Sequence, residues 1–153
     1  MGASSSSDVD FDKFDFDSVT ISSNYIDKGS FGEVYGPILW NSKQFALKRS
    51  FFNASTPVDD FKSKVKGKMD IWTTVKHKNL IEIHKVVFRP KALYIIMEYA
   101  GGGSLRRVID NCDTTVHVLN WASQIAEGML YLHGKHIVHR DLKSSNSEYA
   151  FHF

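Results

Sequence analysis

Three polar side chains near the end of the chain have the types and the spacing of a phosphoryl-transfer site. They lie in Ile137-Val138-His139-Arg140-Asp141-Leu142-Lys143-Ser144-Ser145-Asn146, where a cation follows the carboxylate by two residues and a carboxamide follows it by five. Asp141 could orient a hydroxyl group and accept its proton, Lys143 could screen a transferring phosphoryl group, and Asn146 could bind a metal ion. We predict that these three residues are catalytic and that Asn146 is a metal ligand.

The length and composition predict one domain in a reducing compartment. The chain has 153 residues, of which 42% are hydrophobic and 24% are charged, as in ordinary globular domains. Its formal net charge of +2 gives no electrostatic argument for a nucleic-acid partner. The single cysteine, Cys112, cannot form an internal disulfide, so we expect a cytoplasmic protein.

The N-terminal segment predicts a flexible leader over residues 1–18. Met1-Gly2-Ala3-Ser4-Ser5-Ser6 fits the acceptor pattern for N-myristoylation, although a disordered serine-rich tail explains the same residues. A single acyl chain anchors weakly, and the aspartates that follow would oppose an anionic membrane. We therefore expect at most weak membrane contact, through myristoylation of Gly2. These acidic residues are Asp8, Asp10, Asp12, Asp15 and Asp17.

Alternating apolar residues and turn signals predict an antiparallel sheet with one helix. The expected strands cover residues 20–26, 33–39, 44–49, 82–88 and 92–99. The segment 57–75 is ambiguous, because its apolar residues fit one face of a helix and also alternate as in a strand. Its length and its start at Pro57-Val58-Asp59-Asp60 favour the helix.

Two further helices are expected after the sheet. Residues 104–110 predict a short helix with Ser104 as its N-cap. Residues 115–133 predict a long helix that Gly134 ends. Leu119, Trp121 and Leu130 widen the apolar surface of the long helix, which we expect to leave an uncovered face for a partner. Its predicted buried stripe is Val118, Ala122, Ile125, Met129 and Leu132.

Three segments upstream of the catalytic residues are consistent with a nucleotide site. Asp27-Lys28-Gly29-Ser30-Phe31-Gly32-Glu33-Val34 places two glycines between strands, which alone would predict only a hairpin. Phe45-Ala46-Leu47-Lys48 follows with a lysine sixteen residues after Gly32. Met97-Glu98-Tyr99-Ala100-Gly101-Gly102-Gly103 ends the last strand in a glycine-rich linker.

In this order, the four segments resemble the glycine-rich loop, lysine strand, hinge and catalytic loop of the protein kinases. The resemblance implies ATP and Mg²⁺ as cofactors, with Lys48 on the α- and β-phosphates, Met97 as gatekeeper, and backbone groups of Glu98 and Ala100 on the adenine edge. Residues 119–146 look most like the tyrosine-kinase-like group, and within it the mixed-lineage and transforming-growth-factor-β-activated MAP kinase kinase kinases. The implied ATP-binding residues are Gly29, Gly32, Val34, Ala46, Lys48, Met97, Glu98 and Ala100.

The resemblance also implies a domain plan. We expect an α+β protein-kinase-like fold over 19–153, with a complete five-stranded small lobe (19–99), a hinge (97–104) and only the first helices of a large lobe (105–153). The D-F-G motif of the family does not follow Asn146. We therefore expect a truncated domain.

Two other positions depart from the family pattern. Asp27 stands at the first glycine of the loop, which predicts weaker nucleotide affinity. Counting back from His77-x-Asn79, Lys68 stands where the family has the glutamate that pairs with Lys48. Lys68 would then either face Lys48 with like charge or extend into solvent, and both alternatives remove the clamp.

Two functions remain open at this stage. The first is a serine/threonine kinase of the MAP kinase kinase kinase type whose protein substrate would be a MAP kinase kinase, with serine/threonine specificity indicated by Lys143. The second is a catalytically inactive kinase-fold module that binds nucleotide poorly or a kinase partner well. The missing D-F-G predicts no phosphotransfer by the 153-residue chain.

Overall fold

A five-stranded antiparallel sheet forms the centre of the structure. The computed structural model describes residues 14, 16, 25–29, 32–51, 58–89, 92–111 and 117–148. The strands are β1 (Tyr25–Gly29), β2 (Gly32–Trp40), β3 (Lys43–Phe51), β4 (Ile83–Arg89) and β5 (Ala92–Glu98), in the spatial order β1-β2-β3-β5-β4. The predicted α+β, kinase-like fold with a five-stranded small lobe is confirmed.

The first hairpin differs from the prediction. The described strand β1 (Tyr25–Gly29) extends past the predicted end at residue 26, because the pairing continues to Gly29, which lies opposite Gly32. Residues 19–24 lie outside the described part of the chain. The next hairpin has the expected polar turn, since Asn41 and Ser42 have φ angles of 48° and 62°, as a two-residue turn between antiparallel strands requires.

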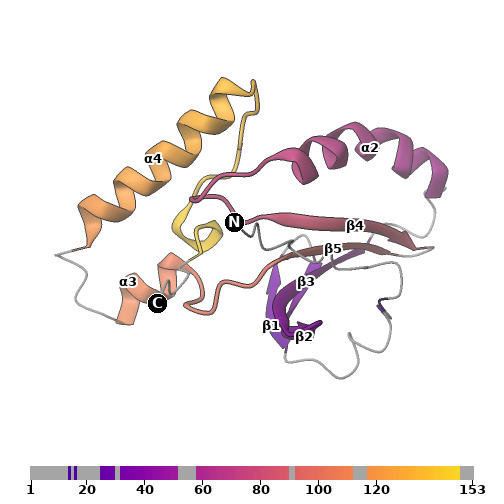
Figure 1. Cartoon of the computed structure of the whole chain (residues 1–153), viewed down its shortest axis with the longest axis horizontal. Helices are drawn as coiled ribbons and strands as arrows, with labels where there is room; N and C mark the ends of the chain where they lie inside the picture. The colour runs from indigo at the N-terminus through magenta and orange to yellow at the C-terminus, as the bar shows by residue number, and fades with distance from the viewer. Residues whose placement is uncertain are drawn as a thin grey trace, which may run out of the picture.

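Helix α2 (Val58–Thr74) packs on one face of the sheet. Figure 1 shows it lying along β4. Met69 is buried against Leu93 and Ile95, so the helical interpretation of this segment is confirmed and the strand alternative is wrong. The apolar residues that fit one face of this helix are Phe61, Val65, Met69 and Trp72. Trp72 is 38% exposed, and the side chains of Phe61 and Val65 lie outside the description.

The strand register separates two faces of the sheet. In antiparallel strands, directly opposed residues share a face. Val34 lies opposite Lys48, and Lys48 lies opposite Ile95. Ala46 lies opposite Met97, so the predicted nucleotide residues of three strands share the α2 side. The other side carries the larger core, which includes Tyr35, Ile38, Phe45, Leu47, Tyr94 and Ile96.

Phe14 and Phe16 pack against this second face, which corrects the prediction of a flexible leader over 1–18. Their side chains are only 4% and 3% exposed and belong to the larger core. Burial of two aromatic rings offsets the conformational entropy of ordering a short segment. The other residues of 1–18, including Gly2 and its proposed acyl chain, lie outside the described part.

Helices α3 (Leu105–Asn111) and α4 (Val118–Gly134) lie beyond one end of the sheet (Figure 1). Ser104 precedes α3, and its hydroxyl oxygen accepts the Arg107 N–H at 3.4 Å, so the predicted N-cap is confirmed. No helix in the described ranges is both long and apolar enough to cross a membrane.

The buried stripe and the end of α4 differ from the predictions. The buried residues are Trp121, Gly128 and Leu132, and Gly128 faces Asn79 and Leu80, which precede β4. Val118 and Ala122 of the predicted stripe are exposed. Of the three residues predicted for the uncovered face, Leu119 and Leu130 are 83% and 74% exposed, whereas Trp121 is buried and the prediction was wrong for it.

The chain leaves α4 at His136 rather than at Gly134. Gly134 is the last helical residue, and His136 takes the left-handed conformation with a φ of 60°. The Ile137 N–H donates to the Leu132 oxygen at 2.9 Å and the His136 N–H to the His133 oxygen at 2.9 Å, which together form a Schellman motif. A histidine therefore occupies the position where glycine is usual.

Candidate active site

The catalytic residues predicted from spacing come together in the loop that follows α4. The Lys143 ammonium lies 3.1 Å from Asp141 Oδ2, and the Asn146 amide donates to the same oxygen at 2.7 Å. The Asn146 amide also donates to the Asp141 backbone carbonyl at 2.8 Å. These bonds fix the carboxylate relative to the lysine and the carboxamide, which is the arrangement required to orient a hydroxyl group.

The same contacts keep Asp141 ionised. Hydrogen bonds from Lys143 and then Asn146 lower the pKa of Asp141 below its ordinary value of 3.8, because both stabilise the charged carboxylate. Asp141 and Lys143 are about half-exposed, at 50% and 52% of their side-chain areas, so solvent weakens the ion pair. Asp141 is thus a carboxylate at neutral pH and able to accept a proton.

Local backbone geometry holds the catalytic loop. Arg140, immediately before Asp141, has a φ of 67°, a strained conformation for a side chain of this size. The Asp141 N–H donates to His139 Nδ1 at 3.3 Å. Beyond the 3₁₀ turn Ser144–Asn146, the Ser147 carbonyl accepts the Leu105 N–H at 2.7 Å, which joins the loop to the start of α3.

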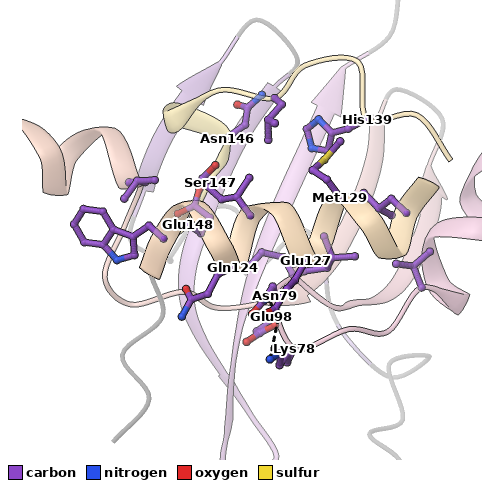
Figure 2. A pocket seen from close by; sticks show the side chains of 18 of the residues that line it. Lys78, Asn79, Glu98, Gln124, Glu127, Met129, His139, Asn146, Ser147 and Glu148 are labelled. Carbon is purple, nitrogen blue, oxygen red and sulfur yellow. Dashed lines mark hydrogen bonds and ion pairs between the residues drawn. The ribbon is translucent and has the colours of Figure 1, made fainter. Parts of the chain in front are cut away.

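A cavity of about 920 Å³ connects the sheet, α4 and the catalytic loop. Figure 2 shows Asn146 and His139 from the catalytic loop, Glu98 from the end of β5, and Asn79 from the segment before β4 around α4. Apolar side chains of both lobes complete the wall, including Ile83, Ile95, Met97, Ile125, Met129 and Leu142. An apolar cavity with a few convergent polar groups is the usual form of a ligand site.

The structure brings only part of the predicted ATP site to this cavity. Lys48, Met97, Glu98 and Asn146 line it. Val34 and Ala46 lie on the same sheet face but outside the lining.

Ala100 also lies outside the lining, and its carbonyl already accepts the Gly103 N–H at 3.2 Å in a turn. The predicted adenine contact of this residue stays a prediction. Asp141 and Lys143 do not line the cavity. They lie next to it, because Asp141 contacts both Lys143 and Asn146, and Asn146 lines the cavity.

The two predicted loop glycines face each other at the β1–β2 hairpin. Gly29 ends β1 and pairs with Gly32. Gly32 has a φ of 132°, and a Cβ atom there would lie 2.1 Å from the Arg49 carbonyl oxygen, so only glycine fits. The side-chain surroundings of Asp27 and Gly29 lie outside the description.

Lys48 has no ion-pair partner among the side chains that the structure describes. It is partly buried and lines the cavity, so its ammonium is available to an anionic ligand. Position 68 lies within α2, but the Lys68 side chain is outside the description, and the choice between the two predicted orientations stays open.

Contacts between α4 and the residues before β4 were not predicted. Glu127 accepts from Lys78 at 2.9 Å and from Asn79 at 3.1 Å, and His77 stacks on Tyr131 with ring centroids 4.9 Å apart. The only sequence signal was the His77-x-Asn79 spacing. It served to align position 68 with the family pattern and did not identify a contact with α4.

The side chain of Glu98 was missed as well. Its Oε2 accepts the Glu82 N–H at 3.2 Å, while the Glu98 N–H donates to the Glu82 carbonyl at 2.9 Å. This reciprocal pair fixes the end of β5 to the residue before β4, and so fixes the hinge side of the cavity. Spacing could not reveal it, because the two residues are paired only by the fold.

Asn146 could contribute one oxygen to Mg²⁺. Its amide nitrogen is used in both bonds to Asp141, which leaves the carboxamide oxygen, a ligand type that Mg²⁺ accepts. Among the described residues, no three His, Cys, Asp or Glu side chains gather into a metal site. A single carboxamide oxygen could join phosphate oxygens and water around Mg²⁺, so the assignment of Asn146 as a metal ligand stays a prediction.

The fold is that of a protein kinase, and residues 22–147 match the family model described as the protein kinase domain. The chain belongs to this family. It is 36% identical over 143 residues to mitogen-activated protein kinase kinase kinase 10 of Xenopus laevis, covering 91% of this chain and 14% of that protein.

Two further relatives carry the same kind of name. Mitogen-activated protein kinase kinase kinase 7 of Drosophila melanogaster is 35% identical over 139 residues, which cover 86% of this chain and 19% of the relative. Human mitogen-activated protein kinase kinase kinase 11 is 36% identical over 122 residues, which cover 77% and 14%. The predicted resemblance to MAP kinase kinase kinases is confirmed, and the chain spans less than a fifth of the length of these relatives.

Proposed function

We propose that this chain forms the nucleotide-facing part of a serine/threonine protein kinase of the MAP kinase kinase kinase type. The observation that carries the proposal is the Asp141–Lys143–Asn146 cluster. One member of the cluster, Asn146, lines the same cavity as Lys48. Asp141 would orient the hydroxyl of a protein serine or threonine, and Lys143 would screen the γ-phosphoryl group.

Different residues along the cavity would contact different parts of ATP. Lys48 would pair with the α- and β-phosphates, and the apolar wall beside Met97 would hold the purine. Mg²⁺, when bound with ATP, would neutralise phosphate charge next to Asn146. A MAP kinase kinase is the proposed protein substrate, and the single cysteine supports the proposal of a cytoplasmic location.

Phosphotransfer and nucleotide binding test different parts of this proposal. We expect Mg-ATP to bind the chain and transfer to a MAP kinase kinase to stay undetectable, because the 153 residues contain no D-F-G aspartate for the metal. Transfer that Asp141→Asn abolishes would contradict the expected inactivity and support the assigned catalytic base. Transfer that survives Asp141→Asn would refute that assignment.

The second candidate is a non-catalytic kinase-fold module that binds a protein partner. Two observations favour it: Lys48 lacks a carboxylate partner among the described side chains, and Leu119 and Leu130 on α4 are exposed. A kinase partner could cover this helix face. A chain that shows no thermal stabilisation by Mg-ATP, but whose binding to a kinase is lost on Leu119→Asp and Leu130→Asp, would favour this candidate.

A further inference from the structure

The face of the sheet opposite Lys48 carries aromatic rings and arginine side chains. This outer aromatic face combines three aromatic side chains and two arginines on β2 to β5, namely Trp40, Arg49, Phe51, Arg89 and Tyr94. We propose that it is a recognition surface for an acidic peptide segment with two phenylalanines separated by one residue. The chain's own segment around Phe14 and Phe16 occupies it in cis.

The two phenylalanines make ring contacts of the kind found in a binding site. The Phe14 ring lies 5.1 Å from that of Trp40 at an interplanar angle of 76°, and the Phe16 ring lies 5.3 Å from that of Tyr94. The two phenylalanine rings are 4.9 Å apart and nearly perpendicular. Edge-to-face pairs at these distances are favourable beyond the area they bury. Both rings are therefore anchors that are seated on the strands.

Charge complementarity selects an acidic segment. The Arg89 guanidinium lies 5.5 Å from the centroid of the Phe16 ring, and that of Arg49 lies 4.6 Å from the centroid of the Phe51 ring. The phenylalanines come from Asp10-Phe11-Asp12-Lys13-Phe14-Asp15-Phe16-Asp17, where aspartates outnumber the single lysine. The sequence around the two phenylalanines is therefore opposite in charge to the arginines of the face, and such complementarity favours encounter.

Phe14 and Phe16 are joined to the sheet through their side chains. They belong to none of the five strands, and the strands pair with each other without them. Their rings share one buried core with Leu47 and Ile96. Because the contacts come from two side chains at alternate positions, a segment of the same chemistry from another protein can take their place.

The test uses the full chain with Phe14→Ala and Phe16→Ala together and a fluorescent peptide of residues 8–18, followed by anisotropy. We expect the peptide to bind the vacated face with a Kd on the order of 0.1–1 mM, and at least tenfold more weakly to the wild-type chain, whose face is occupied. The matched ligand control is the same peptide with alanine in place of Phe14 and Phe16 and with Phe11 kept. Equal binding of the two peptides to the vacated chain overturns the proposal.

A second pair of variants guards against loss of folding. If the double alanine variant does not fold, the chain with Phe14→Leu and Phe16→Leu keeps apolar volume and is expected to bind the native peptide at least threefold more tightly than wild type does. In the vacated background, Arg89→Gln should weaken binding about two- to fivefold, whereas Lys135→Gln, at the end of α4, should not. No gain of binding in either double variant, or equal effects of the two charge variants, refutes the assignment. The nucleotide cavity lies on the other face, so failure here leaves the kinase proposal intact.

Discussion

Replacing Phe16 with alanine measures how firmly the N-terminal segment is held. The ring is 3% exposed and contacts Phe14, Tyr94 and the Arg89 guanidinium. Truncation of a buried phenylalanine costs about 3–5 kcal/mol when the surroundings cannot relax. Because Phe16 lies outside the five strands, we expect its surroundings to relax after truncation and the loss to be near the lower end, about 3 kcal/mol.

The free energy of unfolding, from urea titration followed by circular dichroism, measures this loss. For a chain of this length, about 3 kcal/mol corresponds to a fall in Tm of roughly 6–12 °C. Leu130→Ala is the control, since its side chain is 74% exposed and its removal should change stability by less than about 0.5 kcal/mol. If Phe16→Ala costs less than about 1 kcal/mol, the segment is not part of the core and the reasoning is refuted.

Three other substitutions test separate parts of the structure. Gly67→Ala should stabilise the chain by about 0.5–1 kcal/mol, because Gly67 lies inside α2 and an added Cβ would meet nothing within 4 Å; a loss of stability in urea titration would argue against the helix. Asn146→Ala should raise the pKa of Asp141 by removing a hydrogen bond to its carboxylate, which ¹³C NMR titration would detect; an unchanged pKa would contradict the geometry. Burial lowers the pKa of His84 below 6.5 despite the nearby Glu82, so the folded state favours neutral imidazole. The stability that neutral His84 contributes is complete above pH 6.5 and is lost as the pH falls through its folded-state pKa. The fall in Tm between pH 7 and pH 5 should therefore be smaller in His84→Gln than in the wild-type chain. An equal fall in the two proteins would refute this.

The order of elements and the catalytic loop could be predicted from the sequence because their signals are local. Asp141, Lys143 and Asn146 lie within six residues, so one loop brings them together whatever the rest of the chain does. Helix α2 was predictable from its length and its acidic first turn, even though its alternating residues also fitted a strand.

The remaining features depend on contacts between distant segments. Phe14 and Phe16 alternate with aspartates, and this pattern alone predicts a disordered acidic tail. Both rings are buried because a distant part of the chain, the aromatic face of the sheet, covers them. The stripe of α4 was misassigned because burial depends on the segment before β4, including the Asn79 oxygen near Gly128. The helix end was placed at Gly134 from propensity alone, whereas the backbone turns at His136.

Binding of Mg-ATP to Lys48→Met, compared with wild type and with Lys43→Met, tests the central claim most directly. Both lysines are on β3, but Lys48 lines the cavity and Lys43 is exposed outside it. Loss of a charge-assisted contact to phosphate should weaken binding at least tenfold in Lys48→Met, measured by calorimetry, with Lys43→Met close to wild type. Equal affinities in the two variants, or no saturable binding by the wild-type chain, would contradict the assignment of this cavity to ATP.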